Sequence, residues 1–163
     1  MPATRRLPDL DPSFAGTRAI GAGAISALAY LGVMYADMAL TGSPSNDLLM
    51  LGRVATSDQR RAICLGFVAH TGFGISLSLI YAAYGRRALP GPPWARGLAI
   101  LMAENTLLWP LAVAADRLHP AMRAGELPLL NRPVSIGQQV ARHIAFGLAL
   151  GLLYGEGKTR PET

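Results

Sequence analysis

Four long apolar segments constrain the fold of this chain more than any other feature of its sequence. A helix of about 20 residues crosses a hydrocarbon layer of about 30 Å, and each segment reaches that length. Only 15% of the 163 residues are charged, and most of the first three segments lack the polar face of a soluble amphipathic helix. The sequence therefore predicts an all-α, polytopic membrane protein with four transmembrane helices. The segments cover roughly residues 17–40, 62–84, 95–115 and 134–155.

A twelve-residue motif occurs in both the second and the fourth apolar segment. Residues 70–81 read HTGFGISLSLIY and residues 143–154 read HIAFGLALGLLY, with six identical positions. A second match links the first and third segments at one constant offset and extends into their following loops. There DLLMLGR (47–53) matches ELPLLNR (126–132). We interpret the chain as one domain, residues 1–163, with repeat 1 at about 17–85, a linker at 86–95 and repeat 2 at about 96–157.

Two hairpins in series have the same orientation, so the repeat is a parallel one, with its pseudo-twofold axis along the membrane normal. Both hairpins keep an acid at the outer end of the odd segment, an arginine in the outer loop and a glycine after the repeated histidine. We interpret these positions as framework, with the two acids solvated, capping a helix end or paired with loop arginines. The positions are Asp37 and Asp116, Arg53 and Arg132, and Gly74 and Gly147.

Small residues recur every four positions in the second and fourth segments, and residues four apart share one helix face. Such faces let helices approach closely in lipid. This spacing predicts a tight four-helix bundle with the second and fourth segments near its axis. The two leucine-rich loops are too short to span a membrane, so we expect them to lie on the bundle as interfacial or re-entrant segments.

The repeated histidines, His70 and His143, fall at equivalent depths in their segments. One interpretation is a neutral imidazole that hydrogen-bonds a neighbouring hydroxyl or carbonyl. Another is ligation of a haem or a chlorophyll-type pigment by both histidines, because axial histidine holds haem iron in many proteins. A histidine-containing proton or ion path is a third. No other cofactor signature accompanies them, so we expect no cofactor and leave a metal at these histidines open.

The second hairpin carries intramembrane polar residues that the first hairpin lacks. When the two repeats are aligned, Glu104 takes the position of Ile25 in the first repeat, and Arg142 takes the position of Ala69. Because a charge in a bilayer is costly unless paired, we expect an ion pair between Glu104 and Arg142, either directly or through Asn105, Gln138 or a water. A pair of Arg142 with Asp116 that fixes the register of two helices is the alternative. A proline at position 110 should kink the third segment. The candidate binding residues are Glu104, Asn105, Gln139, Arg142, His143 and His70.

The chain contains no His-x-x-x-His, no phosphate-binding glycine-rich loop, no Gly-x-Ser-x-Gly and a single cysteine, so we expect no enzyme activity. The net charge of +5 comes from basic residues at segment ends, not from a nucleic-acid footprint. Their distribution favours an orientation with both termini cytoplasmic. The expected partners are the lipid bilayer and other membrane proteins or further copies of the chain.

His70, Gly74, Tyr81 and the Asp47–Arg53 loop, with their repeats, resemble features of small, uncharacterised four-helix bacterial inner-membrane proteins. The resemblance implies the architecture and no activity. Three functions therefore stay open. The first is a helix-packing scaffold or accessory subunit of a membrane complex. The second is a small transporter or proton/ion path through Glu104, Arg142 and His143. The third is a haem- or pigment-binding protein that uses both repeated histidines.

Overall fold

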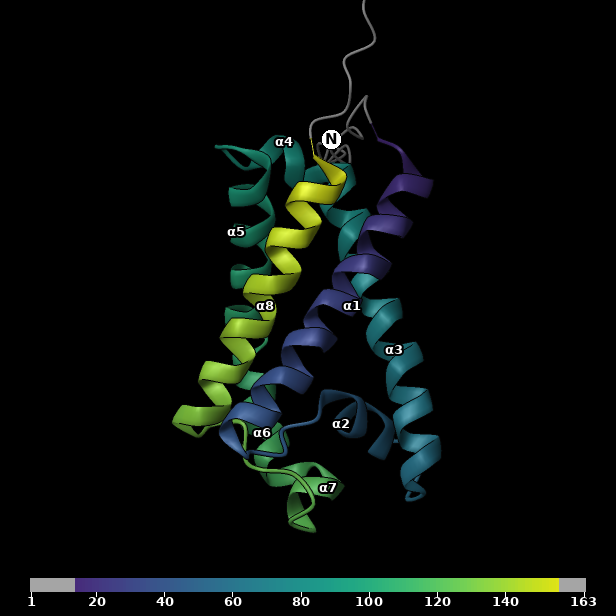
Figure 1. Ribbon diagram of the computed structural model, residues 1–163, viewed down its shortest axis with the longest axis vertical. Helices are drawn as coiled ribbons and strands as arrows, with labels where there is room; N and C mark the ends of the chain where they lie inside the picture. The colour runs from purple at the N-terminus through teal and green to yellow at the C-terminus, as the bar shows by residue number, and fades with distance from the viewer. Residues whose placement is uncertain (1–13, 156–163) are drawn as a thin grey trace, which may run out of the picture.

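The computed structural model describes residues 14–155, and the regular structure within that range is entirely helical (Figure 1). The all-α prediction is confirmed. The predicted domain limits, the end of repeat 2 at 157 and the placement of the two termini fall outside the described residues. The helices are α1 (Gly16–Thr41), α2 (Asp47–Arg53), α3 (Gln59–Ile80), the π-helical turn η1 (Tyr81–Gly85), α4 (Arg86–Ala88), α5 (Pro93–Leu107), α6 (Trp109–Leu118), α7 (Pro120–Arg123) and α8 (Pro133–Tyr154).

The long helices run up and down in chain order, so the first and last described residues lie at the same end of the molecule (Figure 1). At this terminal end the backbone N–H of Ala15 donates to the hydroxyl of Tyr154 at 3.1 Å. Helices α2 and α7 lie at the opposite end, which we call the loop end (Figure 1). Helices α1 to α3 form the first hairpin, and α5 to α8 form the second.

The long helices lie side by side in the order α5, α8, α1, α3 (Figure 1). Helix α8 packs against α5 and α1, and α1 also packs against α3, whereas α3 and α8 are not among the extensively paired helices. The predicted position of the second segment near a bundle axis is not supported along α3, which packs on α1 and α2, whereas the end of that segment, η1, is buried and contacts α5. The physical reason is the width of its packing face. The buried residues of α3 form one narrow stripe: Ala62, Gly66, Gly74 and Ser78.

Glycines at the helix crossings explain how closely the helices approach, as the small-residue spacing predicted. A Cβ atom on Gly97 of α5 would lie 2.3 Å from the carbonyl oxygen of Gly147 on α8, and one on Gly147 would lie 2.8 Å from the carbonyl oxygen of Gly97. In the first hairpin, a Cβ on Gly74 would lie 3.1 Å from the Cβ of Ala27. Each hairpin is thus closed by backbone-to-backbone packing that a larger side chain would separate.

Two helices are long and apolar enough to cross a membrane: α1 and the continuous helix Gln59–Ala88, which α3, η1 and α4 form together. The bent pair α5 and α6 counts as a third if it is one broken span. The prediction of four spans therefore holds only in the coarser form of two or three. Helix α8 is not among them, because polar side chains in its first half lower its hydropathy. These are Ser135, Gln138, Gln139, Arg142 and His143.

The third apolar segment is broken, as the proline predicted. Helices α5 and α6 meet at Leu108 with a bend of 42°. Pro110 occupies the first turn of α6. Its ring has no N–H to donate and excludes the carbonyl of Thr106, one turn earlier, from the usual helical hydrogen bond. The bend directs α6 toward the loop end, where α7 follows.

The two leucine-rich loops, predicted to be equivalent, differ in structure. Residues 47–53 form α2, which packs on α3, whereas residues 126–132 contain no helix. Pro128 contributes to the difference, because the residue before a proline is disfavoured in the helical conformation. The framework arginines differ too: Arg53 pairs with Glu126 at 2.7 Å and so joins the two loops, whereas Arg132 is exposed in front of α8.

Candidate functional site

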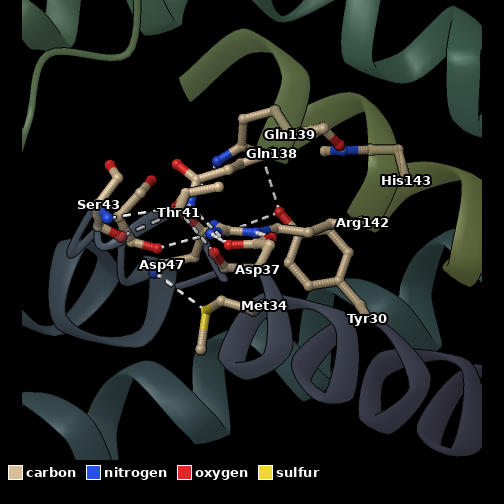
Figure 2. A network of polar contacts seen from close by, with 11 residues as sticks. Tyr30, Met34, Asp37, Thr41, Ser43, Asp47, Gln138, Gln139, Arg142 and His143 are labelled. Atoms are coloured by element: carbon tan, nitrogen blue, oxygen red, sulfur yellow. Dashed lines mark hydrogen bonds and ion pairs between the residues drawn. The ribbon is translucent and has the colours of Figure 1, made fainter. Parts of the chain in front are cut away.

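Arg142 lies near the middle of α8, and its side chain is fully buried. Two carboxylates of the first hairpin hold its guanidinium group (Figure 2). The Nε and Nη2 atoms donate to the two carboxylate oxygens of Asp37, both at 2.6 Å. Nη1 donates to Asp47 Oδ2 at 3.0 Å, and Nη2 also donates to the carbonyl of Ser45 at 2.8 Å. These four contacts use four of the five N–H bonds of the side chain, so the group is almost saturated by protein acceptors.

Local structure at the loop end brings the two acids to Arg142. Asp37 lies one turn before the end of α1, which Gly42 terminates with φ of 68°, a conformation that favours glycine. The chain turns back there, and Asp47 becomes the first residue of α2. Asn46 caps α2, because its side-chain oxygen accepts from the N–H of Leu49 at 3.0 Å. Asp47 is thereby fixed at a helix N-terminus, which stabilises nearby acceptor groups.

Tyr30 extends the network from the loop end toward the middle of the helices (Figure 2). Its hydroxyl oxygen lies 2.5 Å from Asp47 Oδ2 and 2.8 Å from Gln139 Oε1. The side-chain nitrogen of Gln139 donates to Asp47 Oδ1 at 3.0 Å. Tyr30, Asp47 and Gln139 therefore touch pairwise, and we call them the three-residue ring. Its members come from α1, α2 and α8, so it joins both hairpins.

The repeated histidines both lie against the phenol ring of Tyr30. The ring centroids are 4.8 Å apart for His70 and 5.3 Å apart for His143. His70 Nε2 lies 3.4 Å from the carbonyl of Ala27, and His143 Nδ1 lies 2.7 Å from the carbonyl of Gln139. The equivalent depth and the carbonyl partners that we expected are both present.

Glu104 lies opposite His143, not opposite Arg142. Its Oε2 atom is 3.1 Å from His143 Nε2, but the geometry of the contact lies outside that of a hydrogen bond. The predicted ion pair between Glu104 and Arg142 is therefore wrong, since Arg142 is occupied by Asp37 and Asp47. Asn105, beside Glu104 on α5, is half-buried and belongs to none of the network contacts among the described residues.

The two framework acids, Asp37 and Asp116, have different roles. Asp37 binds the helix arginine described above, and the side chain of Gln138 donates to it at 2.6 Å. Asp116 accepts instead from the backbone N–H groups of Leu130 at 2.5 Å and Asn131 at 2.9 Å. Asp116 thus binds the loop that follows it, and neither of the two acids caps a helix end as we expected. The expected pairing with a loop arginine is found at neither acid.

Sequence reasoning missed two members of the network, Tyr30 and Asp47 as a partner of Arg142, and it expected Gln138 only as a bridge to Glu104, whereas Gln138 binds Asp37. Helical spacing could have found Tyr30, because it lies seven residues before Asp37 and so shares its helix face. Gln138 and Arg142 are four residues apart and share a face for the same reason. Nothing in the spacing indicated Asp47, whose position depends on the turn between α1 and α2.

A haem or pigment held between the two repeated histidines does not suit this arrangement. Helix α1 lies between α8 and α3 in the row, and the phenol ring of Tyr30 contacts both imidazoles. That ring takes up the space that a macrocycle ligated from both sides requires. The described residues also contain no group of three or more histidine, cysteine or acidic side chains with metal-binding geometry. Cofactor binding by His70 and His143 stays a prediction without support from their surroundings.

The network is not the wall of a substrate cavity. The crevice beside Asp47, between α2 and the loop that precedes α8, has no room for a water molecule. A surface hollow of about 340 Å³ lies further out at the loop end and is lined by residues such as Pro44, Glu126 and Arg132. The ionic groups are therefore packed against protein and against one another.

These features define an all-helical protein with two or three helices able to cross a membrane and a buried ionic network between its two hairpins. The chain belongs to a family of unknown function (DUF6789), whose profile matches residues 15–163. The predicted resemblance to an uncharacterised family is thereby confirmed. No curated protein and no solved structure matches the chain.

Proposed function

We propose that this protein is a non-enzymatic, multi-pass protein of the bacterial inner membrane that acts as a helix-packing scaffold or accessory subunit of a membrane complex. One observation carries the proposal: the buried guanidinium of Arg142 in the second hairpin is bound by Asp37 and Asp47 of the first. The strongest polar interactions of the interior hold hairpin to hairpin. They leave no cavity beside them in which a substrate could bind.

The same arrangement supports four spans in two tandem hairpins, with α8 as the fourth. Polar residues are tolerated in a membrane helix when they face the protein interior and are paired. Ser135, Gln138, Gln139 and Arg142 of α8 are all buried. Its exposed large side chains are apolar, including Val134 and Leu152. Helix α8 therefore has a low overall hydropathy but an apolar outer surface. Because its polar residues face inward, α8 suits a bilayer.

The edges of the helix row supply surfaces for lipid or for other membrane helices. Helix α3 exposes Val68 and Phe73, at 69% and 65% of their surface, and α6 exposes Leu111 at 67%. Along α3 and α6, away from the contact between η1 and α5 at the terminal end, the helices present more lateral surface than a closed bundle of the same helices would. This shape suits a protein that packs beside other membrane proteins or beside copies of itself.

The scaffold proposal is tested by placing a photo-crosslinking amino acid at Val68, Phe73 or Leu111, one position at a time, in the native membrane. We expect protein adducts from at least one edge of the row, visible as a larger species on a denaturing gel. Ala124, exposed in the loop after α7, is the matched control and should give no adduct of that size. Recovery of the monomer alone from all three apolar positions would contradict the proposal.

A proton or ion path is the second candidate, and the contact between Glu104 and His143 favours it. His143 directs Nδ1 to a backbone carbonyl, and its Nε2 lies 3.1 Å from the Glu104 carboxyl, so two groups of the kind that carry protons meet in the interior. Proton flux into liposomes should then fall in Glu104→Gln and stay unchanged in Glu126→Gln, an equal change at the loop end. Equal flux in wild type and Glu104→Gln would remove this candidate.

A further inference from the structure

The three-residue ring has one contact more than it has protons when Asp47 is ionised. Its three contacts join Tyr30 to Asp47, Tyr30 to Gln139, and Gln139 to Asp47, at 2.5, 2.8 and 3.0 Å. Each hydrogen bond needs one proton between its two heavy atoms. The phenol supplies one proton, and the Gln139 amide directs one of its two N–H bonds at the other two residues, while a carboxylate only accepts. One of the three contacts would then bring two acceptors together.

Turning the Gln139 amide over does not remove the shortage. In the reversed orientation the amide nitrogen donates to the Tyr30 oxygen, and the phenol donates to Asp47. The amide oxygen then faces Asp47 Oδ1, again acceptor against acceptor. Both orientations become complete when the carboxyl group of Asp47 carries a proton. A bridging water is no substitute, because the three contacts are direct and the crevice beside Asp47 has no room for one.

Charge balance leads to the same conclusion. Arg142 has one positive charge, and its two short contacts at 2.6 Å are both with Asp37, a bidentate geometry that makes the strongest ion pairs. The contact from Arg142 to Asp47 is longer, at 3.0 Å. Two ionised carboxylates would leave one uncompensated negative charge among buried side chains, which is costly. A neutral Asp47 leaves the cluster without net charge.

We propose that the three-residue ring is a proton-binding site, in which Asp47 holds a proton in the folded protein while Asp37 alone carries the charge that neutralises Arg142. This inference goes beyond a scaffolding role, because it assigns a ligand, the proton on Asp47, to the interface between the hairpins. The proton completes the contacts by which α2 is joined to α1 and α8. Loss of the proton would set acceptors against each other at that junction.

Besides Arg142 and Asp37, three titratable side chains and one helix end lie around the site in the described part of the chain. His70 on α3 and His143 on α8 contact the Tyr30 ring, and Glu104 on α5 contacts His143. The N-terminus of α2, at Asp47 itself, favours a carboxylate and opposes the proton. Helix α2 has only seven residues, so its field at Asp47 is weak. The cost of bringing two acceptors together in a place closed to water outweighs it.

Substitution of the two acids by asparagine tests the proposal, since asparagine matches a neutral acid in shape and supplies an N–H in place of the acid O–H. We expect Asp47→Asn to fold and to melt close to wild type in detergent. We expect Asp37→Asn to lose roughly 10 °C or more of melting temperature, because it leaves Arg142 without its charge partner. Failure of Asp47→Asn to fold, or equal losses in both variants, would overturn the assignment.

Infrared spectroscopy of the purified full chain provides a direct reading of the proton. The carbonyl band of an un-ionised carboxylic acid should be present in wild type, and its Asp47 component should vanish in Asp47→Asn. Tyr30→Phe should shift that component, because it removes one hydrogen bond from the acid. Glu104→Gln separates any contribution from that residue. A wild-type acid band that is unchanged in folded Asp47→Asn would also overturn the proposal.

Discussion

A buried arginine is stable only when its N–H groups meet acceptors, and Arg142 finds these acceptors in the first hairpin. Asp37 takes two N–H groups of the planar fork, and Asp47 and the carbonyl of Ser45 take two more. A lysine at this position would present a single ammonium group with no fork. The residue therefore acts through geometry as well as charge, which is why both hairpins must be in register around it.

At the residue scale, we predict that Arg142→Ala lowers the free energy of unfolding by about 3–5 kcal/mol, because it strands two buried carboxyl groups. Arg142→Lys should cost less, about 2 kcal/mol, since it keeps the charge and loses the bidentate contact. Denaturant unfolding in detergent micelles measures both. The control is Arg132→Ala, an exposed arginine, expected within about 0.5 kcal/mol of wild type. The prediction fails if Arg142→Ala is as mild as this control.

The partner of Arg142 shows where residue-level reasoning from the sequence stops. Burial of an arginine in an apolar segment correctly implied an acid partner. Glu104 and Asp37 both satisfied that requirement by type and approximate depth. The choice between them depends on which face of α8 meets α1 and which meets α5, and no spacing within one helix contains that information.

Among the helices, close packing depends on backbone contact at glycines. The pair α5 and α8 meets at Gly97 and Gly147, and α1 and α3 meet near Gly74. The four-residue spacing of small residues indicated this packing in advance, because it is a property of one helix face. The same spacing did not show that α3 packs through only one of its faces. The sequence therefore placed the second segment near the axis of a bundle, a position that the packing of α3 does not support.

At the element scale, we predict that Gly97→Ala destabilises the protein by about 1–3 kcal/mol, because a Cβ there would meet the Gly147 carbonyl oxygen at 2.3 Å and the backbone must move apart. Gly72→Ala is the matched control: it is also mid-helix, but nothing lies within 4 Å of its Cβ position. Gly72→Ala should be neutral or stabilising by up to about 1 kcal/mol. Equal melting temperatures for the two variants would contradict the packing argument.

The molecule as a whole is two helical hairpins tied together most firmly at the loop end. Besides the network around Arg142, the ion pair of Arg53 with Glu126 and the contact of His119 Nε2 with the Met50 carbonyl at 2.9 Å join the two outer loops. At the terminal end, Tyr154 meets Ala15. The ties at both ends hold the two hairpins alongside each other along the central pair α1 and α8.

At the scale of the whole molecule, the proposed four spans predict the sides on which loops lie. In a chain with Cys64→Ser, Ala55→Cys and Ala124→Cys should react with an impermeant maleimide on intact cells. Ala88→Cys should react only after permeabilisation. All three alanines are exposed, so the substitutions are matched. Four spans place Ala55 and Ala124 on the same side of the membrane. Labelling of only one of these two positions on intact cells would show that the prediction of four spans is wrong.

The sequence by itself determined the helices, because their bounds follow from apolar length, proline position and small-residue spacing, which are local along the chain. It therefore anticipated the four long helical segments, the break near Pro110 and the close crossings at Gly74 and Gly147. Only the tertiary structure decided the order α5, α8, α1, α3 and the partners of Arg142. These depend on which faces meet across the molecule, and on the turn after α1 that carries Asp47 back to the helix interface.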